Sequence, residues 1–195
     1  MLENDDINII KIDFTLSTNE EYLTNNMKSV EYIKNQLISF PQIKSVIQIL
    51  KRFLRRQKMN EVHTGGISSL TLFLLVLNCV KNMNPFMLLY NSHLLIEVFK
   101  KFTVFEFKKK GINEYNLDYF LLFNNEKSVP YIMNPLTGIN VCKVGCCKGN
   151  DINNTFYEGY NRLVKEMNSF ENIFICRINP FLINKSIDSI VNLLK

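Results

Sequence analysis

The sequence lacks an apolar run long enough to cross a membrane. Its longest apolar stretch, residues 70–80, is far shorter than the roughly 20 residues that a transmembrane helix needs. The opening residues, LENDDIN, have neither the basic start nor the apolar centre of a signal peptide. The number of cysteines, 5, is odd. We therefore expect a protein of a reducing compartment, with free thiols and no membrane contact.

Residues that could hold zinc are also scarce. Three of the cysteines cluster in CKVGCC, residues 142–147, but this spacing is not the paired C-x2-C of a zinc site. Only His63 and His93 could complete a site, and neither is close in sequence. Ordinary reduced thiols are favoured over zinc.

Glycine is rare too, with 7 in the whole chain, yet two of them are adjacent in NEVHTGGISS, residues 60–69. The composition around them is that of a folded domain, since 47% of the residues are hydrophobic and 12% are aromatic. The net charge of +5 permits an anionic partner without requiring one. The glycine pair therefore calls for a local explanation.

The pattern of apolar residues predicts a mostly helical domain with one leading strand, residues 7–17, that carries Asp13. Apolar residues recur at helical spacing from Met27 to Leu37, after a polar stretch that ends in two asparagines. FPQ, residues 40–42, is expected to end this helix and start the next. Further helices are predicted at 70–80, at 92–102, from a cap at Asp151, and at 186–195, with a hairpin between 119–123 and 129–133.

The second helix predicts a basic face next to the glycine pair. Its stretch from Lys51 to Lys58 contains five basic residues and no acidic one, and Lys51 and Arg55 lie one turn apart. The pair, the two glycines and a helix start capped by Ser68 or Ser69 are the elements of a phosphate site. A solvated basic face beside an ordinary turn is the alternative. No G-x4-G-K-[ST] phosphate loop is present.

Asp13 and residues 134–143 are two further candidates that carry little functional information when each is taken alone. Asp13 lies in the middle of the leading strand, where a carboxylate is costly unless it is exposed or holds a metal. Taken alone, an exposed edge-strand position explains it. NPLTGINVCK, residues 134–143, is by composition a turn-rich loop.

The run ILKRFLRRQKMNEVHTGGISS, residues 49–69, resembles a signature of the noncanonical poly(A) polymerases. These are DNA-polymerase-β-like nucleotidyltransferases that include the TRAMP-type enzymes. IDFTLS with TNNMKSVEYIK, NPLTGINVCK and KSIDSIVNLL resemble further segments of the family. The resemblance implies a mainly α (α+β) fold: a helical central and PAP-associated domain, residues 18–195, with one residual strand of the catalytic palm, residues 1–17, and a short hairpin.

The resemblance also implies a set of site residues. Asp13 corresponds to the third carboxylate of a site for two Mg²⁺ (or Mn²⁺) ions. Asn25 corresponds to the ribose contact, with Asn19 and Asn26 as rivals. The remaining assignments are the triphosphate pair Lys51 and Arg55, the phosphate hydroxyl of Ser69, and the base-recognition residues Asn140 and Lys143.

Several positions depart from the family pattern. Leu70 stands where many members have an aromatic ring that stacks on the base, and Asn134 and Lys143 replace the usual Asp and Arg. The family's Gly-Ser motif and its Asp-x-Asp pair precede Asp13, where this chain has only twelve residues. We therefore expect a chain truncated at its N-terminus, which holds the nucleotide-binding half and does not polymerise alone.

The implied function is part of a template-independent RNA nucleotidyltransferase that adds AMP to RNA 3′ ends in nuclear RNA surveillance. The implied partners are ATP, with UTP as the alternative, an RNA 3′ end, a zinc-knuckle RNA-binding protein and a helicase. A catalytically inactive central-domain scaffold that binds nucleotide or an RNA-binding protein is the second hypothesis. An unrelated helical domain with a basic face is the third.

Overall fold

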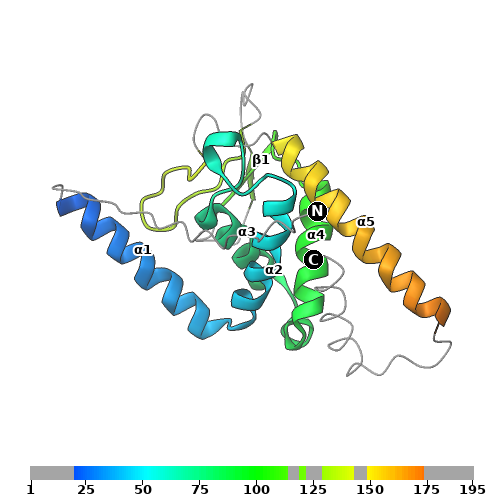
Figure 1. Ribbon diagram of the computed structural model, residues 1–195. Helices are drawn as coiled ribbons and strands as arrows, with labels where there is room; N and C mark the ends of the chain where they lie inside the picture. The colour runs from blue at the N-terminus through cyan, green and yellow to red at the C-terminus, as the bar shows by residue number, and fades with distance from the viewer. Residues whose placement is uncertain (1–19, 114–118, 122–128, 143–148, 174–195) are drawn as a thin grey trace, which may run out of the picture.

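The computed structural model describes residues 20–113, 119–121, 129–142 and 149–173. The expected mostly helical fold is confirmed (Figure 1). The longer elements are α1 Glu20–Ser39, α2 Gln42–Arg56, α3 Ser69–Asn82, α4 Asn91–Val104 and α5 Gly149–Ile173. The short ones are the 3-10 turns η1 Val62–Thr64 and η2 Pro85–Leu89, and the strands β1 Lys110–Ile112 and β2 Tyr119–Leu121.

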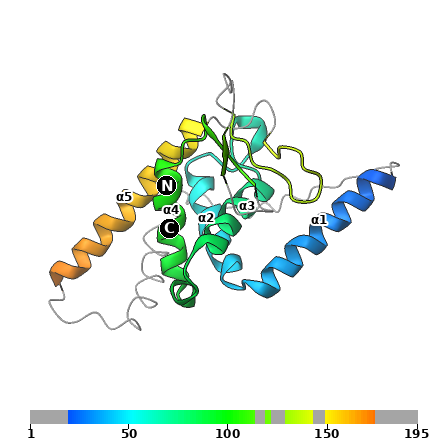
Figure 2. The same cartoon turned by 180° about the vertical axis from the view of Figure 1, so that it is seen from behind.

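Helix α3 forms the centre of the fold. Every residue from Thr71 to Val80 is buried, as expected for a helix that is apolar on all sides. The helix begins at a side-chain cap, because the backbone N–H of Thr71 donates to Ser68 Oγ at 3.0 Å. Helices α1 and α5 lie on opposite sides of the group formed by α2, α3 and α4 in both views (Figures 1 and 2).

Helix α2 forms as the sequence predicts. Pro41 occupies its N-cap position, and the helix packs against α3 and α4. Its buried residues are Ile43, Val46, Leu50, Phe53 and Leu54. The start predicted for the first helix is wrong, because α1 already runs through the polar stretch from Glu20. Two glutamates in its first turn favour a helix there, since negative charge stabilises the N-terminal end of a helix.

Helices α4 and α5 pack closely through aromatic rings. Phe99 of α4 lies between Phe53 of α2, at a centroid distance of 5.2 Å, and Phe156 of α5, at 5.5 Å. Gly159 of α5 faces the same ring, and a Cβ added there would overlap the Cδ1 and Cε1 atoms of Phe99. The absence of a side chain at this glycine lets the two helices approach each other.

Replacing this glycine is therefore expected to destabilise the protein. Gly159→Ala gains about 1 kcal/mol of helix propensity, but the added Cβ meets the Phe99 ring, which is buried and packed against two other rings. Overpacking of this kind costs about 1–3 kcal/mol and usually exceeds the gain in propensity. Urea unfolding followed by circular dichroism should show a lower free energy of unfolding. The exposed neighbour Glu158→Ala is the control, and an equally stable Gly159→Ala variant would contradict the packing.

The strand pairing differs from the predicted hairpin. Segment 119–121 pairs antiparallel with β1, with Lys110 opposite Leu121 and Ile112 opposite Tyr119, and does not pair with 129–133. Ile132 instead lies beside Ile112 in a parallel bridge. The reason is burial, because Ile112 and Ile132 are both fully buried. The backbone of Ile112 also bonds to Tyr131 O at 2.8 Å and to Met133 N at 2.9 Å.

Further predictions concern the fifth helix, the two ends of the chain and the cysteine cluster. Asp151 was expected to cap the fifth helix, but α5 begins at Gly149, so Asp151 lies within its first turn. The leading strand with Asp13 and the closing helix 186–195 lie outside the described residues, as does most of the CKVGCC cluster. None of the described helices is long and apolar enough to span a bilayer.

Candidate functional site

The basic face lies on the exposed side of α2. Lys51 and Arg55 are exposed, whereas Leu50 and Leu54, the residues just before each of them, are buried. Neither cation forms an ion pair with a described residue. Residues four apart project from the same face of a helix, so these two charges are side by side and available to an anion.

The loop 58–67 folds back on the end of α2 and carries the chain to α3. The Met59 N–H donates to Leu54 O at 2.8 Å, and the Ile67 N–H donates to Met59 O at 2.8 Å. Lys58 adopts a positive φ of 56° at the point where the chain leaves the helix. These bonds fix the path from Arg55 to the start of α3.

The glycine pair has a reason within this loop. Gly65 has a φ of 87°, a left-handed conformation that L side chains rarely adopt. At Gly66, an added Cβ would lie 2.6 Å from the backbone C and O atoms of Met59 and 2.7 Å from Glu61 N. The sequence predicts glycines that let a ligand approach the backbone. In the structure, the backbone at Gly66 instead lies close to the backbone of Met59 and Glu61. The pair shapes the loop and is not in itself a sign of a ligand.

The two serines at the start of α3 have different roles. Ser68 Oγ accepts from Thr71 N and lies 2.8 Å from Thr71 Oγ1, so its hydroxyl is used in capping the helix. Ser69 is exposed and has no hydrogen-bond partner among the described residues. Its hydroxyl, together with the free N–H groups at a helix start, can donate to an anion.

The loop that carries Asn140 packs against the same end of α3. Cys142 Sγ lies 3.9 Å from Thr71 Oγ1, which in turn contacts Ser68. This contact joins residues 71 positions apart in sequence. A threonine among the apolar residues of the predicted third helix is the one sequence feature that marks this contact. The structure therefore brings the 134–142 segment and Ser69 to one end of α3.

The Asn140 side chain holds this loop in place. Its Oδ1 accepts from Ile132 N at 2.9 Å and from Cys142 N at 3.0 Å, and its Nδ2 donates to Pro130 O at 3.1 Å. A carboxamide has two N–H donors, so one remains without a partner among the described residues. Asn140 thus has a structural role and can still donate one hydrogen bond to a ligand.

The other candidate residues are placed only in part. Asn25 lies within α1, and its side chain is outside the described residues, as are Asp13 and Lys143. Among the residues that the structure describes, no group of three or more His, Cys, Asp or Glu side chains could hold a metal ion. The described residues therefore do not fit an Mg²⁺ or Mn²⁺ site, and no step through a metal is derived from them.

Comparisons with known proteins show a similar sequence and a similar fold. No protein-family model matches the sequence. Poly(A) RNA polymerase protein 1 of Saccharomyces cerevisiae is 34% identical over 62 residues, which is 32% of this chain and 10% of that protein. A solved structure of the polymerase core of TRAMP, a RNA surveillance complex, matches 69% of this chain with a TM-score of 0.59 and 23% identity. The likeness to that structure is one of fold.

The extent of these matches is limited. The chain corresponds to a tenth of the length of the yeast protein and to 47% of the solved polymerase chain. The activity and the substrates of the full-length proteins are therefore considered below as proposals.

Proposed function

We propose that this chain is the nucleotide-binding part of a template-independent RNA nucleotidyltransferase that adds AMP to RNA 3′ ends. One observation carries the proposal. Lys51 and Arg55, which have no ion-pair partner among the described residues, are joined to Ser69 by a hydrogen-bonded loop, and the Asn140 loop packs against the same end of α3. This arrangement supports a site in which the two cations bind the phosphates and Asn140 contacts the base. The similarity to a yeast poly(A) RNA polymerase supports the choice of substrate.

Each residue has a distinct role in this proposal. The ammonium of Lys51 and the guanidinium of Arg55 neutralise the triphosphate, and the Ser69 hydroxyl donates to a phosphate oxygen. The remaining N–H of Asn140 donates to an acceptor on the base, with Lys143 beside it in sequence. Asn25 contacts the ribose. Asp13 keeps its proposed role as a ligand of Mg²⁺ or Mn²⁺.

The proposal extends to the setting of the reaction. Residues 18–195 form the nucleotide-binding domain, and residues 1–17 belong to the catalytic palm. The RNA 3′ end is the acceptor, ATP is the donor with UTP as the alternative, and the reaction takes place in nuclear RNA surveillance. A zinc-knuckle RNA-binding protein and a helicase are the proposed partners.

Affinity should increase with the number of phosphates. With Mg²⁺ present, we expect ATP to bind about 10-fold more tightly than ADP, and AMP to bind more weakly again. The reason is that each hydrogen bond to a charged group contributes about 1.5–3 kcal/mol. Isothermal titration calorimetry with the three nucleotides measures this. Equal affinities for ATP, ADP and AMP would contradict a triphosphate site.

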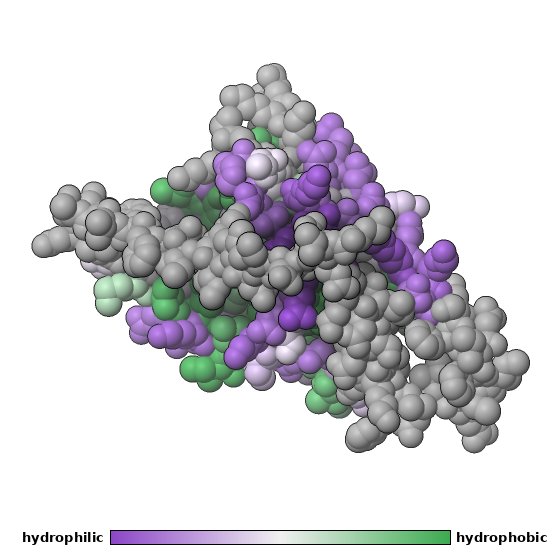
Figure 3. Space-filling view, viewed as in Figure 1, coloured by the Kyte–Doolittle hydropathy of each residue, from purple (hydrophilic) through white to green (hydrophobic). Residues whose placement is uncertain are grey.

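One observation favours the scaffold as a second function. Phe86 and Leu89 of η2 are 79% and 71% exposed, an unusual state for two large apolar side chains in one short turn. Hydrophobic residues are visible along the lower edge of the molecule (Figure 3), and Gln42 Nε2 fixes η2 to α2 by donating to Leu88 O at 3.0 Å. This chain would bind ATP under either function. Only a longer form of an enzyme would extend an oligo(A) primer, so primer extension by that longer form separates the two functions.

A further inference from the structure

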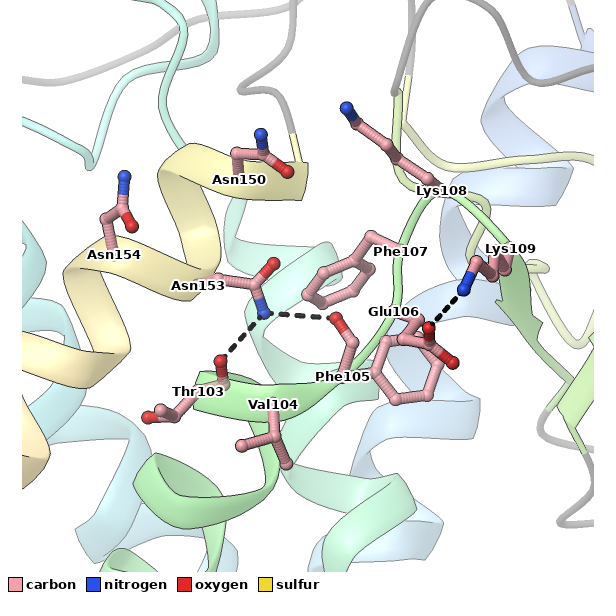
Figure 4. Close-up of a pocket in the computed structure, with 10 residues that line it drawn as sticks. All are labelled: Thr103, Val104, Phe105, Glu106, Phe107, Lys108, Lys109, Asn150, Asn153 and Asn154. Atoms are coloured by element: carbon pink, nitrogen blue, oxygen red, sulfur yellow. Dashed lines mark hydrogen bonds and ion pairs between the residues drawn. The ribbon is translucent and has the colours of Figure 1, made fainter.

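A polar cavity lies between the end of α4 and the start of α5. Its volume is about 380 Å³, and it is lined by residues 103–109 and by three asparagines of α5 (Figure 4). This volume is in the lower part of the range of ligand pockets, about 300–1,000 Å³. None of the candidate residues on α2, on α3 or in the Asn140 loop lines it.

Asn153 fixes the shape of this cavity. Its Nδ2 donates to Phe102 O at 2.6 Å and to Phe105 O at 3.0 Å, which satisfies carbonyls at the end of α4. These bonds link the two walls, which are almost 50 residues apart in sequence. Phe105 and Phe107 are buried beneath the opening. The cavity is thus held by the protein itself and does not need a ligand to form.

The polar side chains around the opening differ in their availability. Lys109 Nζ is bound to Glu106 Oε1 at 2.7 Å, and this hydrogen bond is the main reason that the pKa of Glu106 is lowered. Lys108, Asn150 and Asn154 have no hydrogen-bond or ion-pair partner among the described residues. Asn150 and Asn154 lie one turn apart on α5, and Lys108 extends from the facing segment toward the first turn of α5 (Figure 4).

We propose that this cavity binds one nucleotide of a single-stranded RNA, with Lys108 on the phosphate and Asn150 and Asn154 on the base edge. This inference rests on the proposed function, since it assigns a second contact to the RNA substrate. A carboxamide both donates and accepts, as base edges require, and a lysine ammonium binds a phosphate as a point charge. Bases of single-stranded RNA are free to turn into such a pocket.

The charges at the cavity favour a nucleotide within a strand over a free triphosphate. Lys108 is the one lining cation without a carboxylate partner among the described residues, because Glu106 holds Lys109 and lies 3.6 Å from Lys110. One positive charge beside a carboxylate matches the single negative charge of a phosphodiester. A triphosphate would need several cations.

Fluorescence anisotropy with a short 5′-labelled single-stranded RNA and the full chain tests the proposal. The variant is K108A/N154A, and the matched control is K165A/N161A, which also removes one exposed lysine and one exposed asparagine from the protein. The control residue Lys165 is about 16 Å along α5 from Asn154. We expect K108A/N154A to weaken RNA binding about 10-fold and the control to weaken it less than 2-fold.

The salt dependence gives a second readout. Loss of one phosphate contact should reduce the slope of log K against log salt by about 0.7 for a single strand. Equal effects of the two variants, or no RNA binding by the unaltered protein, would overturn the inference. Free AMP that displaces the RNA at similar concentration would also overturn it, because the site would then bind mononucleotides. ATP binding, measured separately, tests the proposed function independently, since it should be unchanged in K108A/N154A.

Discussion

Replacing Lys51 and Arg55 together by alanine is expected to reduce ATP affinity by at least about 100-fold, because two hydrogen bonds between charged groups are lost at about 1.5–3 kcal/mol each. Both side chains are exposed and make no ion pair with a described residue, so the fold should not suffer. Titration of Mg²⁺–ATP by calorimetry gives the affinity, and circular dichroism checks that the variant is folded.

The same helix offers a closely matched control. Arg52 and Arg56 are also exposed, also four residues apart, and displaced from the first pair by one residue each. One residue turns a helix by about 100°, so R52A/R56A removes the same charge from a different face. We expect this variant to lose only the general attraction of a positive surface, about 2- to 3-fold. Equal losses in both variants would assign ATP binding to the net charge of α2 and would refute the site.

The helices could be predicted because their signals are local. The buried stripe of α2 recurs every three or four residues, and the uniformly apolar sequence of α3 can only be stable in a core. The position of Lys51 and Arg55 on the same face of α2 follows from the same periodicity. These features depend on residues close in sequence, and the structure agrees with them.

The strands could not be predicted in the same way. Strand β1 has three residues, one of them a lysine that follows two others, so no alternating pattern marks it. Its pairing depends on the burial of Ile112 against Ile132, which is 20 residues away. Residues 119–123 have 129–133 as a suitable segment nearby in the sequence, but 119–121 pair with β1, which precedes them in the chain. Strand pairing is decided by burial in three dimensions, which the sequence does not display.

The candidate site likewise has features that can be predicted from local sequence and features that depend on tertiary contacts. Its charged pair is visible in the sequence, whereas the contact of Cys142 with Thr71, which brings the Asn140 loop to α3, is not. The three hydrogen bonds between the Asn140 carboxamide and backbone groups are also not evident from the sequence. A residue type that suits base recognition is equally suited to holding a turn. Asn140 holds the turn in this structure, and its contact with a base belongs to the proposed function.

The second large effect is expected on stability, from a substitution at Gly66. Gly66→Ala is expected to lower the free energy of unfolding by about 3 kcal/mol, since its Cβ would meet the backbone of Met59, which cannot move aside as a flexible side chain could. Relief of this overlap would break the bonds from Gly66 N to Glu61 O at 2.7 Å and from Ile67 N to Met59 O at 2.8 Å. Each such bond contributes about 1 kcal/mol. Urea unfolding measures the loss.

A substitution at the neighbouring Gly65 distinguishes the cost of crowding from the cost of an unfavourable backbone conformation. At Gly65 an added Cβ meets nothing within 4 Å, so Gly65→Ala carries only the cost of a positive φ of 87°, about 1–2 kcal/mol. Gly66→Ala should therefore be the less stable variant, and it should also weaken ATP binding while still folded, because the displaced loop leads directly to Ser69. Equal stabilities would show that strain and not close approach selects the glycines. A destabilised Gly66→Ala with unaltered ATP affinity would separate the loop from the nucleotide site.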